Sequence, residues 1–111
     1  MFTSIRTSKA NKEIVTELSR KFNLGAENTV ARIALAYSLS QKYLLSLSNV
    51  ADSQGKEYSK SVLFGNNLSY YIGLICVKYK LYKTDKDIPK YIKLHLDDGL
   101  QLLNRELCDN P

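Results

Sequence analysis

Apolar residues recur every three or four positions along much of this chain, a spacing that is typical of amphipathic helices. Each such helix must bury one face, so the chain is predicted to form a compact, mainly α domain of four to five helices. The expected apolar stripes are Ile14, Leu18 and Phe22 beside Val15; Val30, Ile33, Ala34, Tyr37 and Leu44; Leu68, Ile72, Ile75 and Tyr79; and Ile92, Leu96, Leu100 and Leu103.

Capping and turn residues set the expected ends of these helices. Thr7 or Ser8 can cap the first helix, because a hydroxyl accepts a hydrogen bond from the free amides of an opening turn. That helix should end at residues 23–25, where glycine supplies a left-handed cap. Later helices are expected to begin at Asn28, after Asn66 or Asn67, and at Asp87 with Pro89 in the first turn. At this length, residues 1–111 are predicted to form a single domain.

A short β-strand is predicted at residues 2–7, FTSIRT. It is too short to stand alone and needs a partner strand, for which a second subunit is one source. Residues 48–61 are polar and are predicted to form a loop, and residues 55–65 within and after it are expected to form a short hairpin or an extended arm. A basic strand followed by a helix, a glycine turn and a second helix is the order of a ribbon-helix-helix unit. We therefore expect a ribbon-helix-helix-like, oligomeric fold.

The chain is basic, and its positive charge is unevenly distributed. Sixteen Lys and Arg residues against eleven Asp and Glu give a net charge of +5 and a pI near 9.2. Residues 78–93 contain six lysines against only Asp85 and Asp87. A field of this sign attracts nucleic acid or anionic lipid. Membrane binding is the weaker option, because these helices lack the face of Trp, Phe and Leu that interfacial helices use.

Two interpretations of these lysines stay open. They can be the solvated ends of two helices, since lysines near a helix C-terminus interact well with its dipole. They can also bind backbone phosphates, which requires only proximity and positive potential, whereas base reading needs better organised side chains. Lys90 and Lys93 are expected on the outer face of the last helix, with Lys93 paired to Asp97. The candidate DNA-binding residues are a lysine patch, Lys78, Lys80, Lys83, Lys86 and Lys90, and an N-terminal basic group, Arg6, Lys9 and Arg32.

No catalytic or metal site is predicted. His95 is the only histidine, and although Asp98 shares its helical face, Asp97 is turned away and a metal needs at least a third ligand. A lone histidine beside a leucine stripe is more typical of a packed or half-exposed surface residue. Cys76 lies among apolar neighbours that hide a thiol, and the glycines form no phosphate-binding loop. We expect a protein that is not an enzyme and needs no cofactor.

The cysteine content and the N-terminus indicate a cytoplasmic location. Cys76 and Cys108 are too few to form a disulfide framework and are expected to be buried, unpaired thiols in a reducing compartment. The first residues contain no apolar run suited to a signal peptide, and the apolar stretch YYIGLICV is too short to span a bilayer.

Three segments of the chain carry motifs that occur in a fixed order. Residues 5–40 carry Arg6-Thr7-Ser8-Lys9 and Arg32-Ile33-Ala34-Leu35, residues 52–65 read DSQGKEYSKSVLFG, and residues 95–103 read HLDDGLQLL. Together these segments resemble the DndE family of small DNA sulfur modification (phosphorothioation) proteins, with its Asp-Ser-x-Gly-Lys-Glu segment and its His-Leu-x-x-Gly-x-x-Leu-Leu ending. The chain departs from the family at the first helix turn, which often reads Thr-Gly-Leu, and at Asp97-Asp98, where other members can be basic.

The resemblance implies a non-enzymatic DNA-binding component of the machinery that replaces a non-bridging backbone oxygen with sulfur. Relatives of this kind are compact helical homotetramers that favour nicked duplex DNA. The implied partners are a cysteine desulfurase, an iron–sulfur protein and ATPase-like subunits of the same modification system.

A scaffold or interaction subunit is the alternative function. Eight tyrosines are many for a chain of this size, and tyrosine is enriched at protein interfaces. The two functions are compatible, because a homo-oligomer repeats one weak basic patch several times and gains avidity when DNA reaches several subunits.

Overall fold

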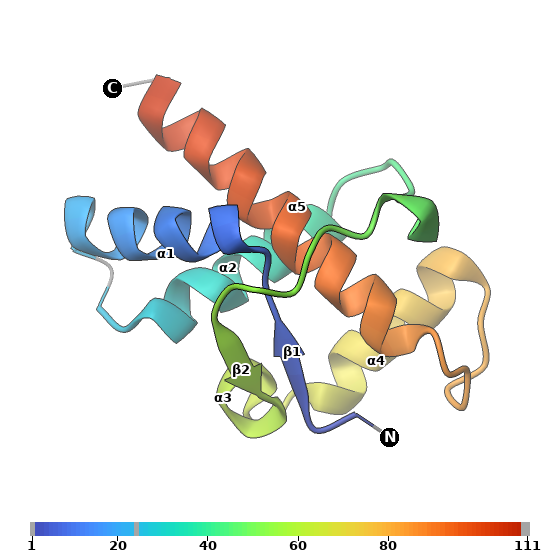
Figure 1. The fold of residues 1–111 in the computed structure, drawn as a ribbon. Coiled ribbons are helices and arrows are strands. Elements are labelled where there is room, and N and C mark those ends of the chain that lie inside the picture. Colours follow the sequence, from blue (N-terminus) through green and yellow to red (C-terminus); the bar gives the residue numbers. More distant parts are fainter. Residues whose placement is uncertain (1, 24, 110–111) are drawn as a thin grey trace.

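The structure, a computed structural model, describes residues 2–23 and 25–109 (Figure 1). The described chain forms helices α1 (Lys9–Lys21), α2 (Glu27–Leu39), α3 (Lys60–Phe64), α4 (Leu68–Tyr79) and α5 (Ile88–Asp109). Strands β1 (Ser4–Arg6) and β2 (Glu57–Ser59) and the 3-10 helix η1 (Leu47–Asn49) complete it. The prediction of a mainly α fold with a short N-terminal strand is confirmed.

Helix α5 is the element that the others pack against. It crosses the molecule in Figure 1 and contacts α1, α2, α4 and β1. Ile92, Leu96 and Leu100 are buried as predicted, and Leu103 is partly buried. These side chains meet Val15 and Leu18 of α1 and the buried face of α2 in one continuous core.

The buried face of α2 is rotated from the one that the sequence predicted. Val30 and Ala34 are buried as expected, but Ile33 is 43% exposed and Leu44 is 62% exposed. The helix begins at Glu27, with Ala26 rather than Asn28 as its N-cap, and ends at Leu39, so Leu44 does not continue its stripe. The other buried positions of this face are Ala31, Leu35 and Ser38.

Small residues let α2 and α5 approach closely. A Cβ built on Gly99 of α5 would lie 1.9 Å from the carbonyl oxygen of Ala34, a distance that only glycine at this position avoids. Contact between these two helices is the most extensive among the described elements. The buried face therefore centres on Ala31, Ala34, Leu35 and Ser38 rather than on Ile33.

The two strands pair with each other inside one chain. β1 and β2 are antiparallel, with Ser4 opposite Ser59, Ile5 opposite Tyr58, and Arg6 opposite Glu57. The strand–helix–helix order that the sequence predicted is present, but the partner strand comes from the predicted 55–65 arm and not from a second subunit. Ile5 and Tyr58 are both buried, so this pair fixes the strands onto the core.

Most of the predicted helix ends are observed. The Ser8 hydroxyl accepts a hydrogen bond from the Asn11 amide, so Ser8 is the N-cap of α1. Asn23 and Gly25 adopt positive φ angles of 51° and 83° in the turn after α1, while Leu24 lies outside the described residues. Asn67 precedes α4, and α5 begins directly after Asp87 with Pro89 in its first turn.

Candidate nucleic-acid interface

The start of α1 is bound to the 52–57 segment through the backbone. The Thr7 amide donates to the Lys56 carbonyl at 2.9 Å, and the Gly55 amide donates to the Thr7 carbonyl at 2.9 Å. A Cβ on Gly55 would lie 2.1 Å from the Ser8 carbonyl oxygen, so this crossing requires glycine. Two of the segments that carry the family resemblance therefore meet at one junction.

Lys93 connects the third segment to the same junction. Its ammonium group donates to Asp97 Oδ2 at 2.8 Å, to the Asp52 carbonyl at 2.8 Å and to the Arg6 carbonyl at 3.0 Å. The predicted Lys93–Asp97 pair is confirmed, but the expectation that Lys93 lies on the outer face of the last helix is wrong. Lys93 is 8% exposed, because three oxygen acceptors replace the water that its charge would otherwise require.

Asp97 stabilises the first turn of α1. Its Oδ1 accepts from the Ser8 amide at 3.1 Å and from Asn11 Nδ2 at 2.8 Å. A carboxylate at a helix N-terminus interacts favourably with free amides and with the helix dipole. Asp97 is therefore an internal anion, neutralised by Lys93.

Arg6 and Lys9 of the N-terminal basic group lie on either side of this junction. The Arg6 guanidinium is 3.4 Å from the Glu57 carboxylate and donates to the Gly55 carbonyl at 3.2 Å, with its side chain 46% exposed. Lys9 has an exposed side chain, and its amide donates to Asp52 Oδ1 at 2.9 Å. That bond is the main reason why the pKa of Asp52 is lower than usual.

Arg32 is placed apart from these two residues and is engaged with backbone. Its Nε donates to the carbonyls of Val62 at 2.9 Å and Leu63 at 3.1 Å, and its Nη2 also bonds the Val62 carbonyl. These carbonyls belong to the last turn of α3, where a cation is favourable. Arg32 therefore holds α3 against α2. This role could not be predicted from the sequence, because Val62 and Leu63 are about thirty positions from Arg32.

The lysine patch surrounds the C-terminus of α4 and the connection to α5. Lys78 is partly buried and donates to the Gln41 carbonyl at 2.7 Å, while Lys90 is 3.7 Å from Asp87. Lys80 is the C-cap of α4, with a left-handed φ of 58°, and its side chain is exposed. Lys83 and Lys86 are exposed in the connection. Lys80, Lys83 and Lys86 are therefore better placed for an external anion than Lys78 or Lys90.

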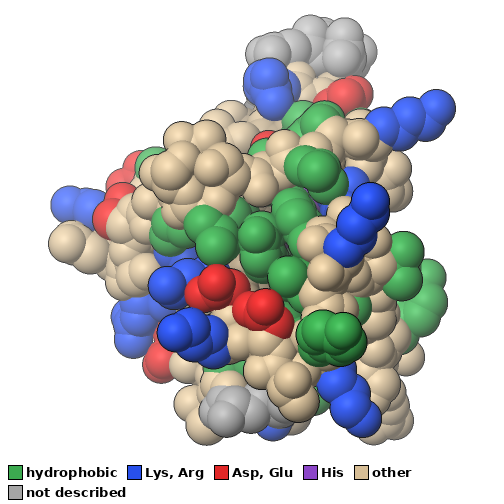
Figure 2. Space-filling view, turned by 90° about the vertical axis from the view of Figure 1, so that its right-hand side faces the viewer, with side chains coloured by type: hydrophobic (Ala, Val, Ile, Leu, Met, Phe, Trp, Pro, Cys, Tyr) green, Lys and Arg blue, Asp and Glu red, His purple; other side chains and the backbone are tan. Residues whose placement is uncertain are grey.

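The side of the molecule on the right of Figure 1 shows how charge and apolar surface are mixed. Figure 2 faces this side and shows hydrophobic side chains gathered in its centre, with Lys and Arg side chains spread around them and acidic side chains nearby. The cations do not form one continuous stripe. This arrangement allows contact with a charged backbone at several points but offers no ordered row of donors for reading bases.

His95 lies in a buried chain of hydrogen bonds and not at the surface. Ser38 Oγ donates to Asp98 Oδ2 at 2.7 Å, so it must accept at 2.8 Å from the proton on His95 Nδ1. His95 Nε2 is then the acceptor for the Tyr79 hydroxyl at 2.6 Å. Burial is the main cause that lowers the pKa of His95 to about 4, and the nearby Lys78 charge lowers it further.

This network places His95 in the interior, packed beside the leucine stripe of α5. Both ring nitrogens of His95 are engaged, and the part of the chain that the structure describes contains no group of three or more His, Cys, Asp or Glu side chains that could hold a metal ion. Tyr43 also donates to Asp98 at 2.7 Å, and burial followed by this bond raises the pKa of Tyr43 to about 12. Among the described side chains, Cys76 carries a free, partly buried thiol.

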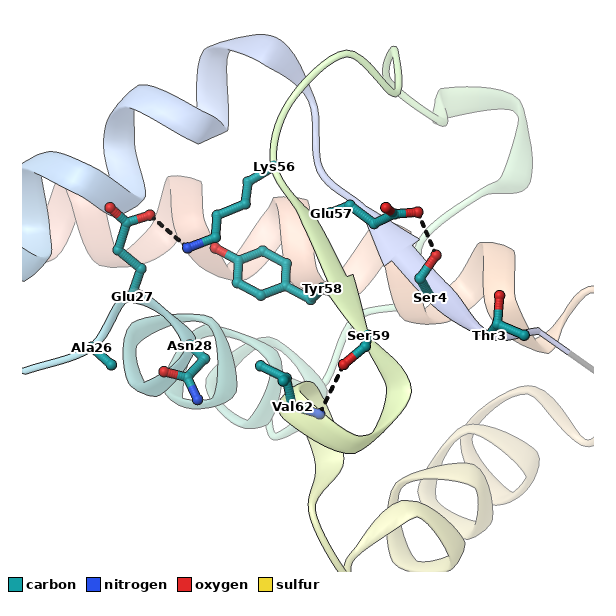
Figure 3. Close-up of a pocket in the computed structure, with 10 residues that line it drawn as sticks. All are labelled: Thr3, Ser4, Ala26, Glu27, Asn28, Lys56, Glu57, Tyr58, Ser59 and Val62. Carbon is teal, nitrogen blue, oxygen red and sulfur yellow. Dashed lines mark hydrogen bonds and ion pairs between the residues drawn. The ribbon is translucent and has the colours of Figure 1, made fainter.

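A cavity of about 790 Å³ lies between the two-stranded sheet and the start of α2 (Figure 3). Its lining includes Lys56 and Tyr58 of the 52–65 segment and Glu27 and Asn28 of α2. Lys56 Nζ is 3.0 Å from Glu27 Oε1 and 5.3 Å from the centre of the Tyr58 ring. This cavity could not be predicted from the sequence, because its two sides come from segments about thirty residues apart.

The family model and the solved structures point to the same family. Residues 4–109 match the family model described as DNA sulphur modification protein DndE. The crystal structure of DndE from Escherichia coli B7A, involved in DNA phosphorothioation modification, is similar with a TM-score of 0.73 and 18% identity, covering 93% of this chain and 98% of that one. A DndE mutant with two glycines replaced by lysine has a TM-score of 0.74 and 19% identity over the same shares. No curated protein matches the chain. Among the described helices, none has the length and apolar character needed to cross a membrane.

Proposed function

The chain belongs to the DndE family of DNA sulphur modification proteins, and we propose that it is the DNA-binding component of the phosphorothioation machinery. It holds duplex DNA, with a preference for nicked duplex, through backbone phosphates and without reading sequence. It performs no catalytic step itself. The sulfur chemistry belongs to cytoplasmic partners in the same system, namely a cysteine desulfurase, an iron–sulfur protein and ATPase-like subunits.

The observation that carries this proposal is the exposure of Lys80, Lys83 and Lys86 around one interhelix connection. Lys80 is fixed as the C-cap of α4, so the patch is attached to a rigid helix end. A lysine needs only to come near a phosphate to release a counterion, so this irregular spacing suits backbone binding. Arg6 and Lys9 supply a second exposed basic area at the β1–α1 junction.

Homo-oligomerisation, as a tetramer, is part of the proposal, because the lysine patch of one copy can make only a few phosphate contacts. Helix α4 has a side that is apolar yet uncovered in the single chain: Tyr70 is 65% exposed and Val77 is 81% exposed. Contact between copies through this side would bury it and would repeat the lysine patch in each copy. Repeated weak contacts then give useful avidity.

Charge reversal at the lysine patch tests the proposal. The double variant Lys80→Glu and Lys83→Glu should weaken binding to intact and nicked duplexes of every sequence alike. If each lysine neutralises one phosphate, the slope of log affinity against log salt should become shallower by roughly 2. The charge-matched control is Lys12→Glu with Lys21→Glu on α1.

This comparison decides whether the lysine patch is the main contact with DNA. A larger loss in the α1 control, or loss on Arg6→Ala with the patch variant unchanged, would show that the lysine patch is not the main contact. The scaffold function remains the alternative, supported by exposed tyrosines such as Tyr82 at 86%. A scaffold would show no salt-sensitive DNA binding and would still capture another modification protein.

A further inference from the structure

The hydroxyl of Tyr58 is a buried hydrogen-bonding group that has no partner among the described residues. The residue is 1% exposed, and no described residue bonds its oxygen. Native proteins pair nearly all such groups, because an unpaired buried hydroxyl lowers stability. A phenylalanine would fill the same space without this loss of stability. The presence of the hydroxyl therefore indicates a role in binding a ligand.

Tyr58 extends from β2 into the cavity at the start of α2. In Figure 3 its ring points from the strand toward the Lys56 amine and the Glu27 carboxylate, above the first turn of α2. The N-cap residue of this helix is Ala26, which offers no side-chain oxygen to the first amides. The cavity therefore combines an unpaired donor, a lysine and the positive end of a thirteen-residue helix dipole.

Glu27 now provides the negative charge in this cavity. One of its oxygens is 3.0 Å from Lys56 Nζ, and the other accepts from the Thr16 hydroxyl at 3.1 Å. The side chains of Lys56 and Glu27 are 38% and 29% exposed, so both can reorient into solvent. Glu57, the other acid in the lining, is already paired with Arg6 and accepts from the Ser4 hydroxyl.

We propose that this cavity is a binding site for a tetrahedral oxyanion, a phosphate group of the bound DNA backbone, in which Lys56 exchanges the Glu27 carboxylate for the ligand. The Tyr58 hydroxyl donates to one phosphate oxygen and the first-turn amides of α2 donate to others. The assignment to DNA rests on the proposed function. Glu27 competes with the ligand for Lys56, so the site binds an isolated anion weakly. Binding of a DNA phosphate becomes stronger when other contacts already hold the duplex against the protein.

Three substitutions and one probe test the site. Inorganic phosphate, titrated at constant ionic strength against the isotope-labelled protein, should shift the amide signals of Glu27 and Asn28 saturably. Lys56→Gln should weaken that binding at least tenfold, and Glu27→Gln should strengthen it several-fold by removing the competing charge. Tyr58→Phe should weaken binding several-fold and yet raise the melting temperature, because it removes an unpaired hydroxyl.

The Tyr58 result separates a ligand-binding role from a structural one. A melting temperature that rises with phosphate binding unchanged would overturn the proposed role of the hydroxyl, and the absence of saturable shifts with phosphate would overturn the site. Competition by an unlabelled duplex assigns the bound group to DNA, whereas shifts that DNA does not reverse assign it to free phosphate.

The same variants distinguish failure of this site from failure of the proposed function. If the duplex binds through Lys80 and Lys83 while Lys56→Gln binds it normally, the cavity is not a DNA phosphate site and the proposed function stands. If phosphate saturates the cavity but no duplex binds at low salt, the oxyanion site stands and the proposed function fails.

Discussion

Gly99 of α5 lies so close to Ala34 of α2 that an added Cβ would be 1.9 Å from the Ala34 carbonyl oxygen. We expect Gly99→Ala to force the two helices apart and to lower the free energy of unfolding by about 3 kcal/mol or more. Gly73→Ala is the matched control, because a Cβ at this helical position meets nothing within 4 Å. It should stabilise α4 by about 0.5–1 kcal/mol. Urea unfolding measures both, and equal effects would show that the α2–α5 contact is looser than described.

The second prediction concerns the buried ion pair between Lys93 and Asp97. Lys93→Met removes the cation and leaves Asp97 buried without its partner, so we expect a loss of about 3–5 kcal/mol. Combining it with Asp97→Asn should cost less than the sum of the two single changes, because the uncompensated charge is gone. Lys90→Met, at a side chain 64% exposed, should cost less than about 1 kcal/mol. Strict additivity in the double variant would contradict the coupling.

The buried His95 predicts loss of stability in mild acid. Its folded-state pKa of about 4 is below the ordinary 6.5, so the unfolded chain binds a proton first as the pH falls. The free energy of unfolding should be constant above about pH 6.5 and fall by on the order of 3 kcal/mol toward pH 4. The lowered pKa of Asp52 acts in the same direction but only below its ordinary value of 3.8. His95→Gln should remove the pH dependence between 6.5 and 4, and its persistence in that variant would contradict this assignment.

Arg32 predicts a loss of stability that must be separated from any loss of DNA binding. Arg32→Ala removes the donors to the last carbonyls of α3 and should lower stability by roughly 1–3 kcal/mol. The control is Arg20→Ala, whose exposed pair with Glu17 should contribute less than about 1 kcal/mol. Thermal melting of both variants gives the comparison. If Arg32→Ala is as stable as the parent but binds DNA less well, Arg32 contacts DNA directly.

Local pattern was sufficient for the helices and several of their ends. The Ser8 cap, the position of Asn67 and the buried Ile92, Leu96 and Leu100 each depend on residues within a few positions of one another. The Lys93–Asp97 pair was also predicted for this reason, since four residues bring two side chains to one helical face.

What the sequence could not provide was the environment around each face. Lys93 looked solvent-exposed because its other partners, the carbonyls of Arg6 and Asp52, are distant in sequence. Ile33 was expected in the core because it fits the apolar spacing of Val30 and Ala34, but the close α2–α5 contact turns the side of α2 that carries Ala31, Ala34 and Leu35 inward. The partner of β1 and the function of Arg32 were missed for the same reason, since both depend on a segment about thirty to fifty residues away.

The central claim is that several copies of this helical body hold DNA through cations on the sugar–phosphate backbone. Its most direct test is the salt dependence of binding, measured by fluorescence anisotropy on nicked and intact duplexes of two unrelated sequences. We expect equal affinity for the two sequences and a slope of log affinity against log salt several times the roughly −0.9 that one neutralised phosphate gives. Binding that is absent at low salt, or that differs strongly between the two sequences with a slope near zero, would contradict the claim.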